Sequence, residues 1–146
     1  MKGSRRLLHL AYRTGAVVDA AMVVPLLAPG VAAAMLGING FAPGADYRYV
    51  AGLCAALMAG WTVLLVWADR DPVARRGVLL ITVCPVVLGL AAAGGYALRS
   101  GLVRPLHLAP TLAVQVAVIV LFLAAYRRAG ALAPQTGQRR TPVGPG

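Results

Sequence analysis

Residues 106–126 read LHLAPTLAVQVAVIVLFLAAY and contain no Asp, Glu, Lys or Arg. About 20 helical residues cross a hydrocarbon core about 30 Å thick, so this run is long enough to span a bilayer. Its apolar residues do not alternate with polar ones, which disfavours a strand of a membrane barrel. Within lipid a segment must satisfy its backbone hydrogen bonds internally. The stretch therefore predicts a transmembrane helix.

Three further apolar runs precede it, at about 14–38, 49–68 and 77–98. The composition agrees with a membrane protein, because 60% of the 146 residues are hydrophobic, only 12% are charged, and the mean hydropathy is +0.77. A soluble domain has about 25% charged residues, so a soluble enzyme domain and a disordered protein are both excluded. We predict an all-α fold, an integral membrane bundle of four transmembrane helices.

The polar segments between the runs are short, and no internal repeat or second domain is visible. We predict one transmembrane domain over residues 1–128 and a disordered cytoplasmic tail over 129–146, which is rich in Gly and Pro. The basic start of the chain and VAAAM at 31–35 also fit a cleavable signal peptide. We favour a retained first helix, because the run is long, contains Asp19 and two prolines, and its removal would leave three spans.

Positive charge is distributed unevenly over the segments outside the runs. The N-terminal segment, the segment between the second and third runs and the C-terminal segment hold 11 of the 14 Lys and Arg residues. With four spans these segments share one side of the membrane, while Arg48, Arg99 and Arg104 share the other. Basic residues are enriched on the cytoplasmic side. We therefore predict a multi-pass protein of the cell inner (cytoplasmic) membrane with both termini cytoplasmic.

The net charge of +10 has a topological meaning here, since the basic residues lie between long apolar runs rather than on a soluble face. We expect the lipid bilayer as the main partner, with anionic lipid head groups attracted to the basic side. We expect no nucleic-acid partner.

Asp19 is the single acidic residue inside an apolar run. It lies five residues past the start of the first run, about 7–8 Å into the membrane. Trp61 and Thr82 fall at a similar depth, so the three side chains form a polar pocket if they face the bundle interior. Two interpretations stay open: an interfacial carboxylate paired with Arg13 or an arginine of the second loop, or a proton or cation site in the interior.

Gln115, one turn after Thr111, is a polar residue near mid-depth in the fourth run. An amide at that depth typically makes an interhelical hydrogen bond, and lining a substrate path is the alternative. The candidate intramembrane polar site therefore consists of Asp19, Trp61, Thr82 and Gln115.

The segment WADRDPVARR at 67–76 is the most distinctive polar string. We predict an i, i+4 ion pair between Asp71 and Arg75, and a contact of Asp69 with Arg70 or Arg76. The string resembles the D-R-x-G-R-R loop of major facilitator transporters, which clamps the cytoplasmic ends of helices, but it lacks the glycine before the two arginines. We interpret these five charged residues as a cytoplasmic cluster that ties two helix ends together.

Small residues recur at a spacing of four, for example at Gly52, Ala56 and Gly60 in the second run. Such residues let helix backbones approach closely. We expect them to serve packing within the bundle, with a seam between two copies of the chain as the alternative.

No phosphate-binding loop, nucleophile elbow or zinc motif is present in the sequence. His9 and His107 lie on opposite sides of the membrane and cannot share a metal ion or haem. Cys54 and Cys84 differ in height by about 10 Å, beyond the reach of a disulfide. We expect no catalytic residues, no metal site, no cofactor and no enzymatic activity. A membrane enzyme or a quinone-linked redox component is the third class of function considered.

The chain resembles a group of small, uncharacterised bacterial four-span inner-membrane proteins in its span count, in DYRY at 46–49 and in WADRDPVARRGVLL at 67–80. That resemblance implies no activity and no site residues. Because catalytic groupings are absent and small packing residues are abundant, we expect a non-enzymatic accessory or self-associating membrane subunit, in a homo-oligomer or a larger complex.

The alternative is a small proton- or cation-coupled transporter that uses Asp19. Small multidrug resistance transporters are similar in having four spans and one carboxylate in the first helix. This chain is longer than they are, its acid is predicted to be shallower, and its 11-to-3 charge bias disfavours the antiparallel dual topology of their dimers.

Overall fold

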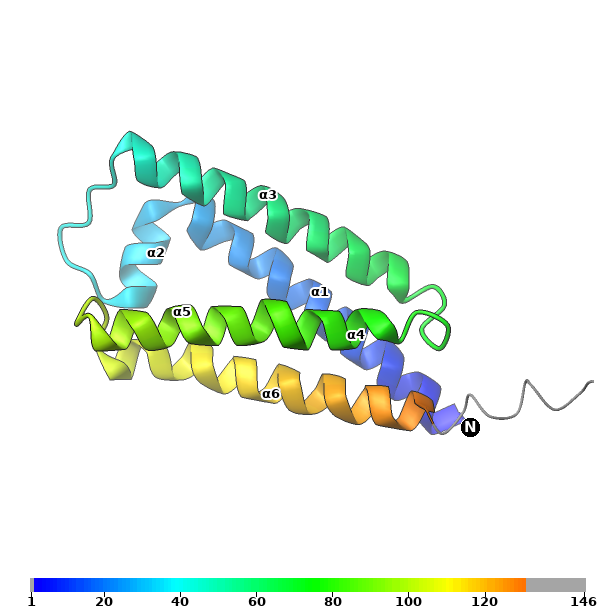
Figure 1. The fold of residues 1–146 in the computed structure, drawn as a ribbon. Helices are drawn as coiled ribbons and strands as arrows, with labels where there is room; N and C mark the ends of the chain where they lie inside the picture. The colour runs from blue at the N-terminus through cyan, green and yellow to red at the C-terminus, as the bar shows by residue number, and fades with distance from the viewer. Residues whose placement is uncertain (1, 131–146) are drawn as a thin grey trace, which may run out of the picture.

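A computed structural model describes residues 2–130, and every regular element within that range is a helix. The elements are α1 (Lys2–Leu27), α2 (Pro29–Leu36), α3 (Ala45–Ala68), α4 (Gly77–Ile81), η1 (Thr82–Val87), α5 (Leu88–Arg99) and α6 (Pro105–Gly130). α4, η1 and α5 follow one another without a break and form one rod (Figure 1). Apart from Ala129 and Gly130, which belong to α6, the predicted tail lies outside the described residues.

Within residues 2–130, four helices are long and apolar enough to cross a membrane: Gly3–Leu27, Ala45–Ala68, Gly77–Arg99 and Pro105–Gly130. The prediction of an all-α fold with four candidate transmembrane helices is therefore confirmed. The protein is a polytopic membrane protein by composition, and its outer surface contacts the lipid bilayer.

The long helices lie lengthwise beside one another (Figure 1). The start of α1, the α3–α4 connection and the end of α6 lie at one end of the bundle, which we call the basic end. The opposite end, called the α2 end, holds α2 and the α5–α6 connection. Segments that the charge pattern predicts on one side of the membrane therefore do lie at one end of the molecule.

The first apolar run does not form one helix, so its predicted bounds of 14–38 must be corrected. α1 starts at Lys2 and ends at Leu27, Ala28 has a non-helical backbone with φ −116° and ψ 89°, and α2 begins at Pro29. A proline disfavours helical backbone at the residue before it and suits the first position of a helix. As a result α2 is a separate short helix that lies across the end of the bundle (Figure 1).

The third span contains a π-helical turn at Thr82–Val87, with Pro85 inside it. Proline has no N–H to donate to the preceding turn. The wider turn resolves this conflict, and the Leu88 N–H donates to the Val83 carbonyl, five residues earlier. The span therefore stays continuous through a proline that would otherwise break it.

The hydrophobic core is concentrated toward the basic end. Its largest fully buried side chains are Leu8 and Tyr12 of α1, Leu65 of α3, Leu79 of α4 and Phe122 of α6. α5 contains no buried residue. In Figure 1 α1 and α3 diverge from α5 and α6 toward the α2 end, where α2 lies between the two pairs. This divergence leaves room for an interior cavity.

Candidate functional site

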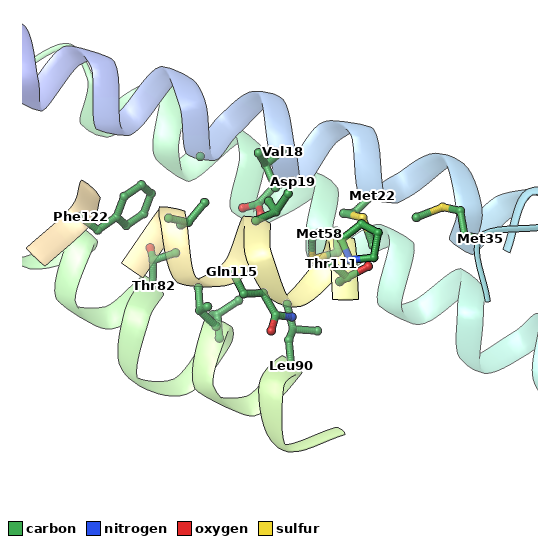
Figure 2. Close-up of a pocket in the computed structure, with 16 residues that line it drawn as sticks. Val18, Asp19, Met22, Met35, Met58, Thr82, Leu90, Thr111, Gln115 and Phe122 are labelled. Carbon is green, nitrogen blue, oxygen red and sulfur yellow. The ribbon is translucent and has the colours of Figure 1, made fainter. Parts of the chain in front are cut away.

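A cavity of about 230 Å³ lies between α1, α3, the third span and α6 (Figure 2). Most of its lining is apolar, and α2 contributes Met35 to it. The polar side chains in its wall are Asp19, Thr82, Thr111 and Gln115. Three of the four candidate site residues therefore surround one interior space.

Asp19 is only 9% exposed, and its carboxylate faces the cavity from α1 (Figure 2). It continues the buried face of α1, which includes Leu8, Tyr12 and Gly15 at helical spacing. No hydrogen-bond partner among the described residues reaches its Oδ2 atom. Asp19 is thus an interior carboxylate without a protein partner for that oxygen.

The helix that carries Asp19 starts before the predicted run, and its residues 2–13 include Arg5, Arg6 and Arg13. Asp19 lies six residues after Arg13, which corresponds to about 9 Å along the helix. Its predicted depth in the membrane stays a prediction. The interfacial pairing with Arg13 is not formed, because Arg13 bonds to Asp69 instead.

Thr82 and Trp61 are joined by a hydrogen bond, in which Trp61 Nε1 donates to Thr82 Oγ1 at 3.1 Å. The Thr82 hydroxyl in turn donates to the Val78 carbonyl at 2.8 Å. Thr82 is buried and lines the cavity, whereas Trp61 is half-buried and lies behind it. The structure therefore connects Trp61 to the cavity only through Thr82.

Gln115 lines the cavity on α6, one turn from Thr111. Its Oε1 atom is buried and has no hydrogen-bond partner within residues 2–130, so the predicted interhelical bond through that oxygen is not formed. Gln115 lies on the inward face of α6 that also carries Leu108, Val118 and Phe122. It therefore adds a second unpartnered oxygen to the interior.

Three methionines line the cavity and were not expected from the sequence. Met22, Met35 and Met58 all contribute to its wall, and with Met1 they are the only methionines of the chain. Thioether side chains are flexible and polarizable, so they adapt to irregular spaces and contact aromatic rings favourably. The position of Met22 could have predicted this, because it follows Asp19 by three residues and therefore lies on the same helix face.

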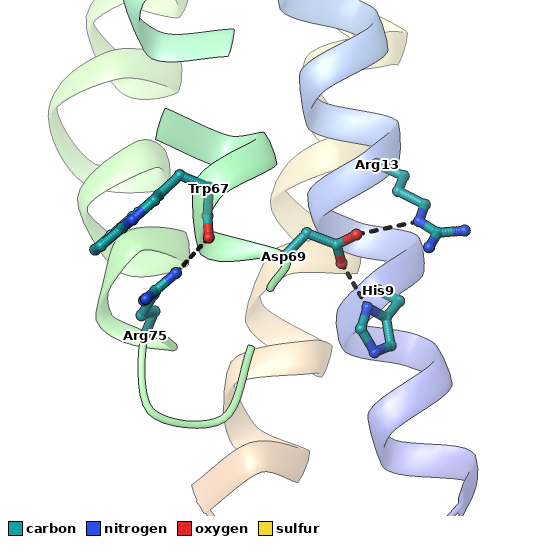
Figure 3. A network of polar contacts seen from close by, with 5 residues as sticks. All are labelled: His9, Arg13, Trp67, Asp69 and Arg75. Carbon is teal, nitrogen blue, oxygen red and sulfur yellow. Dashed lines mark hydrogen bonds and ion pairs between the residues drawn. The ribbon is translucent and has the colours of Figure 1, made fainter. Parts of the chain in front are cut away.

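The polar cluster at the basic end joins different partners from those predicted (Figure 3). Asp69 Oδ1 lies 2.6 Å from His9 Nδ1, and Arg13 Nε donates to Asp69 Oδ2 at 3.1 Å. The expected contacts of Asp69 with Arg70 or Arg76 are replaced by these two contacts with α1. Asp69 therefore ties α1 to the end of α3.

Arg75 is held by an aromatic ring rather than by the predicted ion pair with Asp71. Its guanidinium lies 3.6 Å from the centroid of the Trp67 ring and donates to the Trp67 carbonyl. The Arg75 carbonyl accepts a hydrogen bond of 2.9 Å from the Tyr12 hydroxyl. Asp71 instead accepts from the Ala74 N–H at 3.4 Å, within its own turn.

Arg76, the next residue of that loop, lies over the Tyr126 ring of α6, with its guanidinium carbon 5.8 Å from the ring centroid. Together with the contacts of Asp69 and Arg75, this places the loop against three helices. The cluster is therefore a structural clasp at the basic end, separate from the cavity.

Within the described part of the chain, no three His, Cys, Asp or Glu side chains lie close enough to hold a metal ion together. Cys54 and Cys84 are free thiols on the exposed surface. The expectations of no cofactor and no enzymatic activity stay predictions.

No protein-family model matches the chain, and neither a curated protein nor a solved structure matches it. Of the resemblance to small four-span membrane proteins, the four candidate spans are therefore supported, and no family is identified.

Proposed function

We propose that the chain is a small membrane carrier in which Asp19 binds a proton or a cation inside the bundle and couples its movement to that of a solute. The observation that carries this proposal is the buried carboxylate, which faces an interior cavity within a span and has an oxygen without a protein partner. This arrangement favours the carrier over a purely structural accessory subunit.

A carboxylate inside a membrane span has an energetic cost. Insertion scales give about 2.5–3.5 kcal/mol for an ionised Asp at the centre of a helix. An apolar residue would fill the same position without that cost, and the basic residue nearest in sequence, Arg13, is engaged by Asp69. A bound proton or cation would remove the unfavourable charge, which supports a binding role for Asp19.

A carrier must open its site toward each side of the membrane in turn. Two deformable points flank the cavity: the π-helical turn at Thr82–Val87 and the break at Ala28 between α1 and α2. We place the basic end in the cytoplasm of the cell, with the α2 end on the far side of the inner membrane, because of the excess of basic residues there.

The test is proton movement in liposomes. Purified protein is reconstituted with a pH-sensitive dye inside, and small amines, carboxylates, sugars and inorganic cations are added in turn. We expect at least one solute to change the internal pH with the wild-type chain, and Asp19→Asn to abolish the response. Asp71→Asn is the matched control, because it makes the same chemical change at an exposed site. Responses that survive Asp19→Asn, or no response to any solute, would contradict the proposal.

A second candidate function, self-association, is favoured by the outer face of α3. A Cβ atom added at Gly52 or Gly60 would have nothing within 4 Å of it, and Ala56 between them is exposed. The expectation that this stripe packs within the bundle is therefore wrong for these residues. Small residues on a lipid-facing surface let a second helix approach closely, which supports a dimer of this chain.

Native mass spectrometry after gentle extraction tests this candidate. We expect a homodimer that dissociates in Gly52→Leu/Gly60→Leu, whereas Ala113→Leu, on the exposed face of α6, leaves it intact. A monomeric wild-type chain would exclude self-association, and a different co-purifying protein at fixed ratio would indicate an accessory subunit. Retained anionic lipids would support the predicted attraction to the basic end.

A further inference from the structure

We infer that the interior cavity binds the methyl end of a lipid tail from the surrounding bilayer, as an unbranched hydrocarbon chain. The inference does not rest on the proposed carrier, because it concerns what occupies the cavity rather than what Asp19 binds. The chemistry of the wall, the shape of the cavity and the place where it opens each support it.

The wall that a ligand would touch is almost entirely carbon and sulfur. Asp19 Oδ2 and Gln115 Oε1 are buried and expose almost no surface. The Thr82 hydroxyl already donates to Val78 and accepts from Trp61. A polar ligand would lose its hydrogen bonds to water and find few replacements here, whereas a hydrocarbon loses none. The wall therefore favours an apolar, uncharged ligand.

The cavity is long and narrow. On α6 its lining extends from Pro110 to Phe122, twelve residues or about 18 Å along the helix. An engineered apolar cavity of about 150 Å³ holds benzene, so in proportion about 230 Å³ holds about nine non-hydrogen atoms. Nine atoms spread over such a length fit an unbranched chain better than a compact ring system.

The three methionines suit such a ligand. Met22, Met35 and Met58 come from three different helices, and all line the cavity. Methionine side chains are flexible and adapt to irregular shapes. A wall that contains them can follow a hydrocarbon chain that itself has many conformations.

The cavity is closed toward the basic end and open toward the α2 end. Phe122, Val118 and Val87, which line its closed half, are buried. Leu90 and Val114 line its other half and are each 46% exposed. Figure 2 shows Phe122 at one end of the labelled lining residues, with Leu90 well removed from it. A chain that enters beside Leu90 and Val114 therefore has its tip near Val118 and Phe122.

The position of this opening identifies the source of the chain. Leu90 lies nine residues before Arg99, and Val114 lies nine residues after Pro105, where α6 begins. Each spacing corresponds to about 14 Å along the helix, close to half of a hydrocarbon core about 30 Å thick. Arginine is costly within hydrocarbon, so Arg99 marks the limit of the apolar region. The opening therefore faces the middle of the bilayer, where the methyl ends of lipid tails lie.

Photochemical crosslinking in vesicles tests the inference. The full-length chain is reconstituted in phosphatidylcholine that contains a trace of the same lipid with a diazirine near the methyl end of one tail. After illumination, mass spectrometry of the peptides locates the attached lipid. We expect attachment to Val87, Val118 or Phe122, which are buried and are reached only through the cavity. Exposed Val116 and Leu88 report contact with the bulk lipid in the same sample.

Two pairs of variants test the entry route. Val114→Trp and Leu90→Trp place a large ring at the opening and should lower attachment to the buried residues at least about fivefold, because a filled entrance leaves no room for the chain. Val116→Trp and Leu88→Trp make the same changes at exposed residues that do not line the cavity and should have no effect. Each variant is first checked for helix content and a monodisperse elution profile, and either opening variant suffices if the other does not fold.

Two further probes identify the source of the chain. The same lipid with its diazirine beside the ester group should not label the buried residues, because that part of the tail stays outside. A nine-carbon alkyl diazirine without a head group represents a free hydrocarbon. If it labels the buried residues and the tail-end lipid does not, the lipid tail is overturned as the occupant.

The remaining outcomes separate this inference from the proposed function. Attachment confined to exposed residues, or attachment to the buried residues that persists in both opening variants, overturns the lipid-tail site. Tail-end labelling of the cavity without proton movement in liposomes supports the site and overturns the carrier. Proton movement that depends on Asp19, without labelling of the cavity, supports the carrier and overturns the site.

Discussion

The Phe122 ring of α6 lies so close to Gly15 of α1 that a Cβ atom at position 15 would come within 2.6 Å of Phe122 Cζ. The same Cβ would lie 3.1 Å from Leu65 Cδ1 of α3. Phe122 is fully buried and lines the cavity, as does Gly15, which lies one turn before Asp19 in α1. Position 15 is therefore where three helices meet and where the close approach requires a residue without a side chain.

Gly15→Ala should destabilise the bundle. Overpacking of a filled interior costs about 1–3 kcal/mol, more than the helix propensity that alanine adds. The measurement is unfolding in detergent followed by circular dichroism. Gly95→Ala in α5 is the matched control, since nothing lies within 4 Å of its Cβ position, and it should be neutral or slightly stabilising. If the two variants were equally stable, the close packing of Phe122 on Gly15 would be refuted.

Asp69→Asn should loosen the attachment of α1 to the α3–α4 connection. The change removes the ion pair with Arg13 and the carboxylate that His9 contacts; the two α1 side chains are 74% and 40% exposed, so we expect a loss of only about 1 kcal/mol. Amide hydrogen exchange in residues 2–13 should accelerate, because these residues lose their tie to the loop. Asp46→Asn, at an exposed site in the first turn of α3, serves as the control. Unchanged exchange in Asp69→Asn would argue against the clasp.

The four candidate spans were predictable because length and hydropathy alone determine whether a helix can cross lipid. The rotation of each helix about its own axis was not predictable. The inward residues of α6 follow a regular spacing through Leu108, Gln115, Phe122 and Ala129, but neighbouring positions are just as apolar. In such a chain the apolar pattern does not distinguish the core face from the lipid face, so the inward orientation of Gln115 could not be derived.

The contacts of Asp69 show a second limit of sequence reasoning. Arg70 and Arg76 lie close enough in the loop for an ion pair with Asp69. The observed partners, Arg13 and His9, lie 56 and 60 residues earlier in the chain. Which residues contact Asp69 depends on how α1 packs against α3. The end of α1, unlike the contacts of Asp69, is marked by a local sequence signal, because a proline at position 29 disfavours helical backbone at Ala28.

Thr82→Val should release the Trp61 indole without changing the volume of the side chain. The variant removes the oxygen that accepts from Trp61 Nε1, and a half-buried N–H without a partner costs about 1–3 kcal/mol. The indole N–H resonance of Trp61 in a ¹⁵N-labelled sample should move upfield as its hydrogen bond is lost. Thr82→Ser keeps the hydroxyl and should keep the resonance in place. A resonance that does not move in Thr82→Val would exclude the bond.

Gly37→Ala should detach α2 from the end of the bundle. Gly37 has φ of 65°, in the left-handed region that costs other residues about 1–2 kcal/mol, and a Cβ there would overlap the His107 imidazole of α6. Gly40 has a similar φ of 69° but open space around its Cβ position. Unfolding of Gly40→Ala therefore measures the backbone cost alone, and the larger loss expected for Gly37→Ala measures the contact with His107. His107→Ala in the Gly37→Ala background should recover that difference, whereas equal losses in the two glycine variants would show that His107 does not hold α2 in place.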